Sequence, residues 1–332
     1  MKRMSRFPLV VVLCAFSLLF LTHGLVKAET ITLKGVTAWP KNIGHSKGML
    51  TLVEVLDEMV AKQAPGELKI QYVGGPESVK TSDQVQAVQR GMVDIANTSG
   101  AYYTHILPDI DALKMTEWTP AEERTNGVFN YLVGLHEKIG IRYLGRTGAN
   151  IKFHLYMNKP MKAADLKGLN IRVSPLYLPV IKGLGGNPVV IAPTDVYQAL
   201  ERNVVDGYGW PAVGITDWGW QKVTKYQIEP GFYLVGDVML MNMASWNKLS
   251  KKLQDMLTQA VIESENRTMA FWKERSQNEA QVLAKAGVQV LPLPPAEQTK
   301  LLQVVYEESW KDLTQKAPKT APELKKLLTK AK

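Results

Sequence analysis

Arg172 is the side chain whose type and position most favour ligand chemistry. It lies in the apolar run Leu169-Asn-Ile-Arg-Val173, which follows the turn at Asp165-Leu-Lys-Gly168 and predicts a short buried strand. A guanidinium removed from water needs an anionic partner, because an unpaired buried charge is costly. A ligand carboxylate or an acid of the protein itself could be that partner, and the residues alone leave both alternatives open.

Aromatic and polar side chains on predicted loops are candidates for the walls of a cleft. Trp210 follows a predicted strand that starts at Val204, and an indole offers a stacking face and one N–H donor. Aromatic residues also fill ordinary protein cores, so each candidate has that second interpretation. The other candidates are Trp39, Ser99, Tyr102 and Tyr103 on early loops, with Trp118, Tyr177, Phe232 and Tyr233 as further walls.

Patterns for catalysis or metal binding are missing from the sequence. The histidines beyond residue 28 lack metal-ligand spacing, and no cysteine follows Cys14. Neither a G-x-S-x-G elbow nor a Walker loop occurs. The glycines at 183–186 precede Pro188 and no helix, so they indicate a helix end rather than a phosphate loop. We therefore expect no enzyme activity, no metal and no cofactor.

The elements around Arg172 predict a parallel sheet. Apolar periodicity and turn residues between 159 and 210 indicate a strand, a helix, a strand, a helix and a further strand. The same alternation runs from Ile31 to Thr98. In such sheets ligands gather at the carboxyl ends of the strands, which is where Arg172 lies.

A repeat links these two halves. Residues 82–94 match residues 194–206 at a constant offset of 112, with Gln-Ala, Arg and Val-Asp in common. Each copy has a hydroxyl suited to an N-cap and then Gly91 or Asn203, which suit a left-handed helix end. We also expect Gln84 to complete a capping box with the hydroxyls at 81–82. Any capped helix before a strand shows part of this pattern, but two lobes of similar construction are the simpler interpretation.

The segment 250–285 contains neither Pro nor Gly and carries an apolar stripe, so it predicts one uninterrupted helix. At about 1.5 Å per residue it would be on the order of 50 Å long, more than the width of one lobe. We therefore expect an α/β, two-lobed, periplasmic-binding-protein-like fold with hinge strands and a long helix that bridges both lobes. Lobe I would comprise 29–149 and 238–277, and lobe II 150–237 and 278–332.

Four motifs in order resemble the DctP-type substrate-binding proteins of TRAP transporters. They are GGPESV near 75, DIANTS at 94–99, the run from DLKGLNIRV through GGNPVVIAPTDVYQALERNVVDG to Pro211, and NMASWNKLSKKLQDML at 242–257. The resemblance covers nearly the whole chain after residue 28. It implies the two-lobed fold with a bridging helix and a role for Arg172 in forking a substrate carboxylate through two hydrogen bonds.

The chain departs from the family pattern at two positions. Where sialic-acid binders carry a second arginine this chain has Lys152, whose point charge is less directional, and a solvated lysine is the alternative. Where sugar-acid binders carry an amide it has Trp210. Members that bind 2-oxo acids can have tryptophan there, preceded by an acid that helps to hold a metal. Gly209 provides no such acid, which again predicts no metal.

Residues 1–28 resemble a secretory signal peptide, with a basic start, an apolar core and small residues before Glu29. We expect cleavage after Ala28 and a periplasmic location. Cys14 lies inside the apolar core and lacks a lipoprotein context. The formal net charge of +9 then falls to +5, spread along the chain, which gives no indication of nucleic-acid binding.

We therefore expect a monomeric extracytoplasmic solute receptor for an organic acid with an apolar or aromatic body. It would close around the acid and deliver it to the membrane subunits of a TRAP permease. A periplasmic sensor that reports to a receptor kinase is the alternative on the same fold, and an enzyme is the third interpretation.

Overall fold

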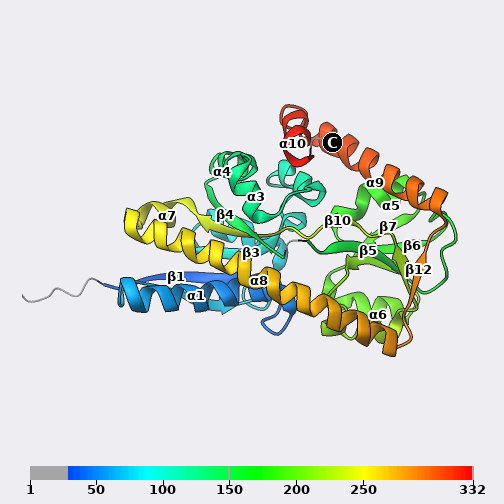
Figure 1. Cartoon of the computed structure of the whole chain (residues 1–332), viewed down its shortest axis with the longest axis horizontal. Helices are drawn as coiled ribbons and strands as arrows, with labels where there is room; N and C mark the ends of the chain where they lie inside the picture. The colour runs from blue at the N-terminus through cyan, green and yellow to red at the C-terminus, as the bar shows by residue number, and fades with distance from the viewer. Residues whose placement is uncertain (1–28, 149, 331–332) are drawn as a thin grey trace, which may run out of the picture.

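The computed structural model of the chain describes residues 29–148 and 150–330. Within these residues the strands form two sheets, and each sheet is the centre of one lobe (Figure 1). The predicted signal segment, 1–28, lies outside the described residues. In the described part of the chain, no helix combines the length and apolar character needed to cross a membrane.

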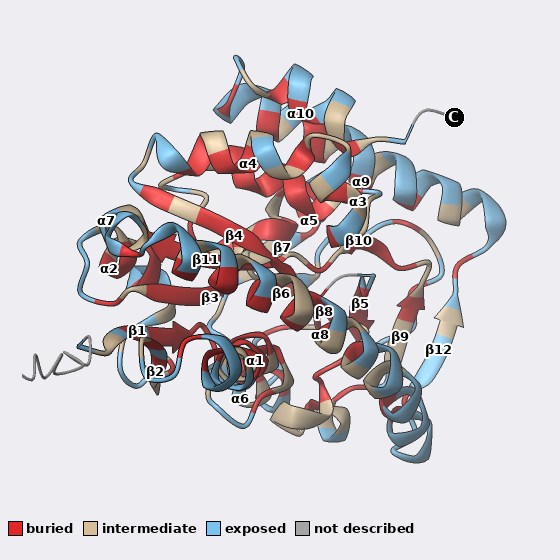
Figure 2. Cartoon of the chain, turned by 60° about the vertical axis from the view of Figure 1, so that its left-hand side comes forward, coloured by how far each residue is buried: buried red, intermediate tan, exposed pale blue. Residues whose placement is uncertain are grey.

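Lobe I is built on the sheet with strand order β2-β1-β3-β11-β4. Strands β2, β1 and β3 are parallel, and β11 runs antiparallel to both β3 and β4. The strands are β1 (Ile31–Thr37), β2 (Leu68–Gly74), β3 (Ile95–Ser99), β4 (Ile141–Thr147) and β11 (Asp237–Asn242). The helices are α1 (Lys47–Gln63), α2 (Gln84–Gln89), α3 (Pro120–Thr125), α4 (Val128–Glu137) and α7 (Met243–Lys248). Figure 2 shows β3, β4 and β11 largely buried.

Lobe II is built on the sheet with strand order β12-β9-β5-β8-β6-β7, and β10 pairs with β5. Its parallel part, β7-β6-β8, repeats the β2-β1-β3 arrangement of lobe I. The strands are β5 (Lys152–Met157), β6 (Asn170–Val173), β7 (Asn187–Val190), β8 (Gly207–Pro211), β9 (Tyr226–Glu229), β10 (Phe232–Leu234) and β12 (Gln289–Pro292). The helices are α5 (Leu178–Gly183) and α6 (Val196–Glu201).

The repeat seen in the sequence corresponds to equivalent structure in the two lobes. Helices α2 and α6 start and end 112 residues apart, and Gly91 and Asn203 both adopt positive φ, at 69° and 53°. The predicted capping was wrong. A 3₁₀ turn precedes each helix, and neither helix has a side-chain N-cap hydrogen bond. Gln84 is instead buried and donates to the Thr37 carbonyl at 2.7 Å.

Helix α8 (Lys251–Lys285) is unbroken and lies across both lobes, as the sequence predicted (Figure 1). Its first turns bury Leu257 and Val261 in the core of lobe I. Further along, Trp272 and Leu283 are buried in cores of lobe II. At 35 residues the helix spans about 50 Å, so one element contributes to the packing of both lobes.

The C-terminal helices differ from the prediction, which assigned all of 278–332 to lobe II. Helix α9 (Pro295–Lys316) begins against lobe II, where Leu301 and Val305 are buried. Its last turns and helix α10 (Ala321–Leu328) pack on lobe I, where Trp310 and Leu324 join the core. The 3₁₀ helix η4 (Pro108–Met115) of lobe I provides the surface that they cover.

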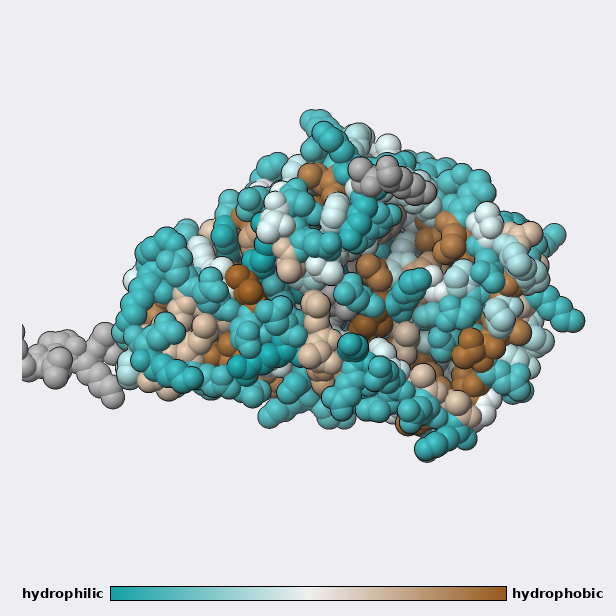
Figure 3. Space-filling view, viewed as in Figure 1, coloured by the Kyte–Doolittle hydropathy of each residue, from teal (hydrophilic) through white to brown (hydrophobic). Residues whose placement is uncertain are grey.

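The chain passes between the lobes where β4 leads into β5, and again where β10 leads into β11. Strand β11 then completes the sheet of lobe I. On the face shown in Figure 3 most of the surface is hydrophilic, and apolar residues form small separate patches.

Candidate ligand-binding site

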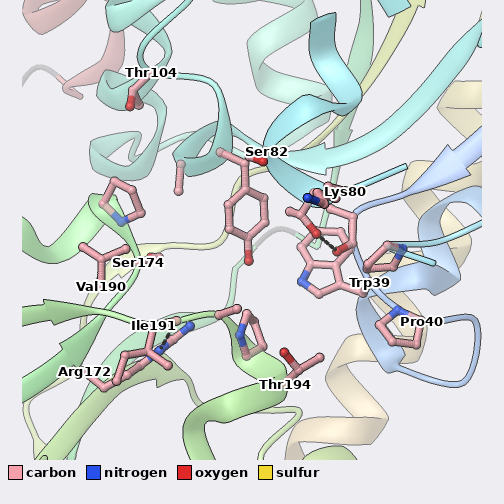
Figure 4. A pocket seen from close by; sticks show the side chains of 18 of the residues that line it. Trp39, Pro40, Lys80, Ser82, Thr104, Arg172, Ser174, Val190, Ile191 and Thr194 are labelled. Carbon is pink, nitrogen blue, oxygen red and sulfur yellow. Dashed lines mark hydrogen bonds between the residues drawn. The ribbon is translucent and has the colours of Figure 1, made fainter. Parts of the chain in front are cut away.

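A cleft of about 570 Å³ lies between the two lobes. Its walls are loops that follow β1, β2 and β3 in lobe I and β6, β7 and β8 in lobe II, at the carboxyl ends of the parallel strands. In Figure 4, Trp39 and Lys80 belong to the lobe I side, whereas Arg172 and Ile191 belong to the lobe II side. The lining comprises Ala38–Pro40, Pro76, Lys80–Ser82, Ala101, Tyr102, Thr104, His105, Arg172, Ser174, Pro175, 190–194 and Trp218.

Arg172 lies at the end of β6 and is 1% exposed. Its Nε donates to the Ile191 carbonyl at 2.9 Å (Figure 4), and Nη1 donates to the Gly209 carbonyl at 3.4 Å. Its guanidinium carbon lies 5.4 Å from the centre of the Trp210 ring. Burial lowers the pKa of Arg172 to about 10, so the group stays charged at neutral pH. No acidic side chain of the described residues forms an ion pair with it, which leaves the internal-acid alternative without a counterpart there.

The charged side chains of the cleft are basic. Lys80, on the loop after β2, adds a second cation from lobe I, and no Asp or Glu belongs to the lining within the described residues. Most of the remaining wall is apolar or aromatic, with Trp39, Tyr102 and Trp218 as the large rings. A space with these walls suits an anion that has an apolar body.

A second, inner cavity of about 30 Å³ adjoins the cleft, because the two share Trp39, Ala101, Tyr102 and Ser174. Its remaining lining residues are His45, Ser99, Phe153, Leu176, Tyr177, Gly209, Trp210, Pro211 and Asp237. These residues come from both lobes and from β11, so the inner cavity lies where the chain crosses between the lobes.

His45 and Asp237 form a buried pair in this wall, with Nδ1 and Oδ2 2.7 Å apart. Burial raises the pKa of Asp237, and His45 partly offsets that rise. The His45 ring stacks on Trp39 at 4.8 Å and meets the edge of Trp210 at 5.9 Å. Neither His45 nor Asp237 was a candidate from the sequence. The position of His45 just after the loop that follows β1 is the signal that could have found it.

Six of the predicted site residues line a cavity. Trp39 and Tyr102 line both cavities, Arg172 lines the cleft, and Ser99, Tyr177 and Trp210 line the inner cavity. The Ser99 hydroxyl also accepts a hydrogen bond from the Ala101 amide at 3.4 Å, at the start of a 3₁₀ turn. Trp210 is 5% exposed, so its indole is part of the wall at the inner end of the site.

The structure does not bring Lys152, Tyr103 and Phe232 to either cavity. Lys152 is exposed, because neighbouring side chains on β5 point to opposite faces and Phe153 takes the inner one. Tyr103 is fully buried in lobe I, and its hydroxyl is 2.9 Å from Nε2 of His136. Phe232 packs edge-on against Tyr177, with ring centres 5.9 Å apart, in the core of lobe II.

Gly209 is required by Tyr177. A Cβ built on Gly209 would lie 2.4 Å from the Tyr177 ring, which is closer than packed carbon atoms approach. The ring therefore occupies the space that a side chain at 209 would need, and an acid there would displace it. Among residues 29–148 and 150–330, no three His, Cys, Asp or Glu side chains gather as metal ligands would.

Polar contacts join the lobes beside the two cavities. The Gly44 amide of lobe I donates to Oδ2 of Asp217 in lobe II at 2.8 Å, and Asp217 also pairs with Arg275 of α8. The buried Nζ of Lys114 in lobe I donates to the Leu176 carbonyl in lobe II at 2.9 Å. The loops that line the site are thus held in contact across the interface between the lobes.

Comparison with known proteins places the chain in one family. A family model described as bacterial extracellular solute-binding protein, family 7 (DctP), matches residues 43–316. The monocarboxylate 2-oxoacid-binding periplasmic protein of Nostoc sp. is 29% identical over 268 residues, which cover 76% of this chain and 70% of that relative.

Solved structures show the same fold. A TRAP periplasmic solute-binding protein from Desulfovibrio salexigens, with bound orotic acid, has a TM-score of 0.80 at 21% identity and covers 90% of this chain and 97% of that one. A Bordetella pertussis extracytoplasmic solute receptor that binds pyroglutamic acid has a TM-score of 0.80 at 18% identity and covers 91% and 100%.

Proposed function

Because the chain belongs to the DctP family of bacterial extracellular solute-binding proteins, we propose that it binds an organic acid between its lobes, with the carboxylate on Arg172. The family match and the structural likeness confirm the resemblance seen in the sequence, the two-lobed α/β fold and the periplasmic location.

The observation that carries the proposal is the environment of Arg172. Its guanidinium is buried and charged, and its hydrogen bonds go to carbonyl oxygens rather than to a carboxylate. A ligand carboxylate would provide the missing negative charge and could accept two parallel hydrogen bonds from the guanidinium. The ligands named for the relatives support this class, since orotic, pyroglutamic and 2-oxo acids are all carboxylic acids.

The walls of the cleft support an apolar or ring-shaped body for the acid. Trp39 and Tyr102 from lobe I and Trp218 from lobe II offer large apolar surfaces around the space next to Arg172. Because both lobes contribute, ligand contacts to each would favour the closed arrangement over an open one. The receptor would then deliver its ligand to the membrane subunits of a TRAP permease, without chemical turnover.

The test has two steps. Native mass spectrometry of the protein purified from the periplasm should find a bound small molecule with a carboxylic acid group. The ligand-free protein is then screened by thermal unfolding against a panel of aliphatic, aromatic and sugar-derived acids, each paired with its primary amide. A ligand present at 100 times its Kd stabilises the fold by about 2.7 kcal/mol, so binding acids should raise the unfolding midpoint.

The amides keep the shape of each acid and remove its charge, so they are the matched controls. We expect a midpoint shift with at least one acid and none with its amide. The proposal fails if the amides shift the midpoint as far as the acids do, or if neither step finds an acid ligand.

A further inference from the structure

Three side-chain atoms of the inner cavity have no hydrogen-bond partner among the described residues. They are Nε2 of His45, the hydroxyl of Tyr177 and Nε1 of Trp210, on residues that are 4%, 1% and 5% exposed. Buried polar groups are nearly always hydrogen-bonded, because a polar atom that leaves water without a partner is destabilising. Three such atoms around a space of about 30 Å³ therefore indicate a polar group that belongs there.

Two of these atoms approach the same point. A Cβ built on Gly214 would lie 3.3 Å from Nε1 of Trp210 and 3.6 Å from Nε2 of His45. Tyr177 lines the same cavity, and its ring lies directly against β8 at Gly209. The three residues thus reach one cavity from lobe I and from two elements of lobe II.

Their hydrogen-bonding roles can be assigned from their neighbours. Nδ1 of His45 lies 2.7 Å from the Asp237 carboxylate, so Nδ1 donates, and in this tautomer Nε2 is the acceptor of the ring. The indole of Trp210 can only donate, and the phenol of Tyr177 can donate or accept. A hydroxyl group satisfies all three, because its oxygen accepts from Trp210 and Tyr177 while its proton goes to His45.

We propose that the inner cavity is a subsite for a hydroxyl group of the bound acid, which makes this chain a receptor selective for hydroxy acids. This inference rests on the proposed function and specifies its substrate class. The hydroxyl would lie on a carbon near the carboxylate, since Arg172 donates to the carbonyl of Gly209, which itself lines the inner cavity. The guanidinium and the Trp210 ring are also only 5.4 Å apart.

Other occupants satisfy the cavity less well. An oxo group accepts hydrogen bonds only, so Nε2 of His45 would remain without a donor. A hydrogen atom or methyl group would leave all three polar atoms unsatisfied. An ordered water is the alternative occupant, because buried waters commonly bond to polar groups that lack another partner. The ligand hydroxyl and a resident water must therefore be distinguished by experiment.

The experiment is calorimetry with two matched sets of acids at pH 7.5. One set is lactate, pyruvate and propionate, and the other is mandelate, benzoylformate and phenylacetate. Within each set only the group next to the carboxylate changes, from hydroxyl to oxo to hydrogen. We expect the hydroxy acid of at least one set to bind about tenfold or more tightly than its hydrogen analogue, because that analogue leaves the buried polar groups unpaired.

Two variants test the assignment. Tyr177→Phe and Trp210→Phe each remove one polar atom and keep an aromatic ring. Both should reduce the preference for the hydroxy acid several-fold, at about 1 kcal/mol for one hydrogen bond, while the affinity for the hydrogen analogue stays within about threefold. Tyr208→Phe is the matched control, because that phenol bonds to Thr224 at 2.8 Å in the core of lobe II and lines neither cavity. It should leave the preference unchanged.

The outcomes separate this inference from the proposed function. Equal binding of hydroxy and hydrogen analogues, or acid binding that excludes every hydroxy acid, overturns the hydroxyl subsite but leaves an Arg172-dependent acid receptor intact. A crystal structure of a complex with water on His45, Tyr177 and Trp210, and the ligand hydroxyl elsewhere, overturns it as well. Failure of all acids in the wider panel would instead refute the proposed function.

Discussion

Replacing Arg172 by methionine should raise the free energy of unfolding of the ligand-free protein and weaken ligand binding. Methionine keeps much of the apolar stem and removes the charge. Burial lowers the pKa of Arg172 from 12.5 to about 10, which at 1.36 kcal/mol per pKa unit corresponds to roughly 3 kcal/mol. That free energy is the cost of keeping the guanidinium charged in an unoccupied cleft.

The net gain in stability should be smaller than this cost. Arg172→Met also leaves the carbonyls of Ile191 and Gly209 without their donors, at about 1 kcal/mol each. We therefore expect the free energy of unfolding of the ligand-free protein to rise by about 1 kcal/mol, as measured by urea denaturation. Arg172→Lys should show a smaller gain in stability. Burial disfavours the charged ammonium, so the lysine must either keep a buried charge or give up its proton, and both cost free energy.

Ligand binding should change in the opposite direction. Losing one partner of a desolvated, hydrogen-bonded charge pair costs about 2–5 kcal/mol, which is roughly thirty-fold to several-thousand-fold in Kd. Arg172→Lys should recover only part of the affinity. The ammonium keeps the positive charge, but it cannot fork across both carboxylate oxygens. Calorimetry on folded Arg172→Met that finds binding within threefold of wild type would refute the reasoning, and so would a large loss of stability in the ligand-free variant.

Three further predictions concern residues around the site and in the core. Lys80→Ala should weaken acid binding by a few-fold and reduce its salt dependence, as expected for an exposed charge worth about 0.2–1 kcal/mol, whereas Lys152→Ala should leave calorimetric Kd values unchanged. Gly209→Ala should destabilise the fold by about 1–3 kcal/mol in urea denaturation, since its methyl would meet the Tyr177 ring at 2.4 Å; an equal cost in a Tyr177→Leu background would contradict this. His136 should destabilise the protein in mild acid, because burial lowers its pKa to about 4 while the unfolded chain takes up a proton near pH 6.5. Stability should therefore fall as the pH drops from 6.5 towards 4, by roughly 2 kcal/mol at pH 5, and denaturation curves of His136→Gln should show that much less acid sensitivity.

The sequence predicted the elements of the fold because their signals are local. Apolar spacing and turn residues indicated the strand and helix alternation of both lobes, and the absence of Gly and Pro indicated the whole of α8. The offset of 112 residues holds for α2 and α6 and for the left-handed residues that follow them. The buried position of Arg172 on β6 followed from its apolar neighbours alone.

Features that depend on distant partners were less predictable. The apolar face of Trp310 and Leu324 indicates burial but does not say which lobe provides the covering surface. Tyr102 and Tyr103 are adjacent, yet a single turn directs one to the cleft and the other to the core beside His136. In the inner cavity, His45 is more than a hundred residues from Tyr177 and Trp210, and nothing local in the sequence brings His45 to Trp210.

The chain starts and ends on the same lobe, which has a practical consequence. Strand β1 and helix α10 both pack on lobe I, so the segments that build lobe II are all internal to the chain. A tether attached beside either element would immobilise lobe I on a surface and leave lobe II free to move. Fluorophores on β1 and α10 would keep a constant separation as the lobes close, whereas a pair on α10 and α6 would report the closure directly.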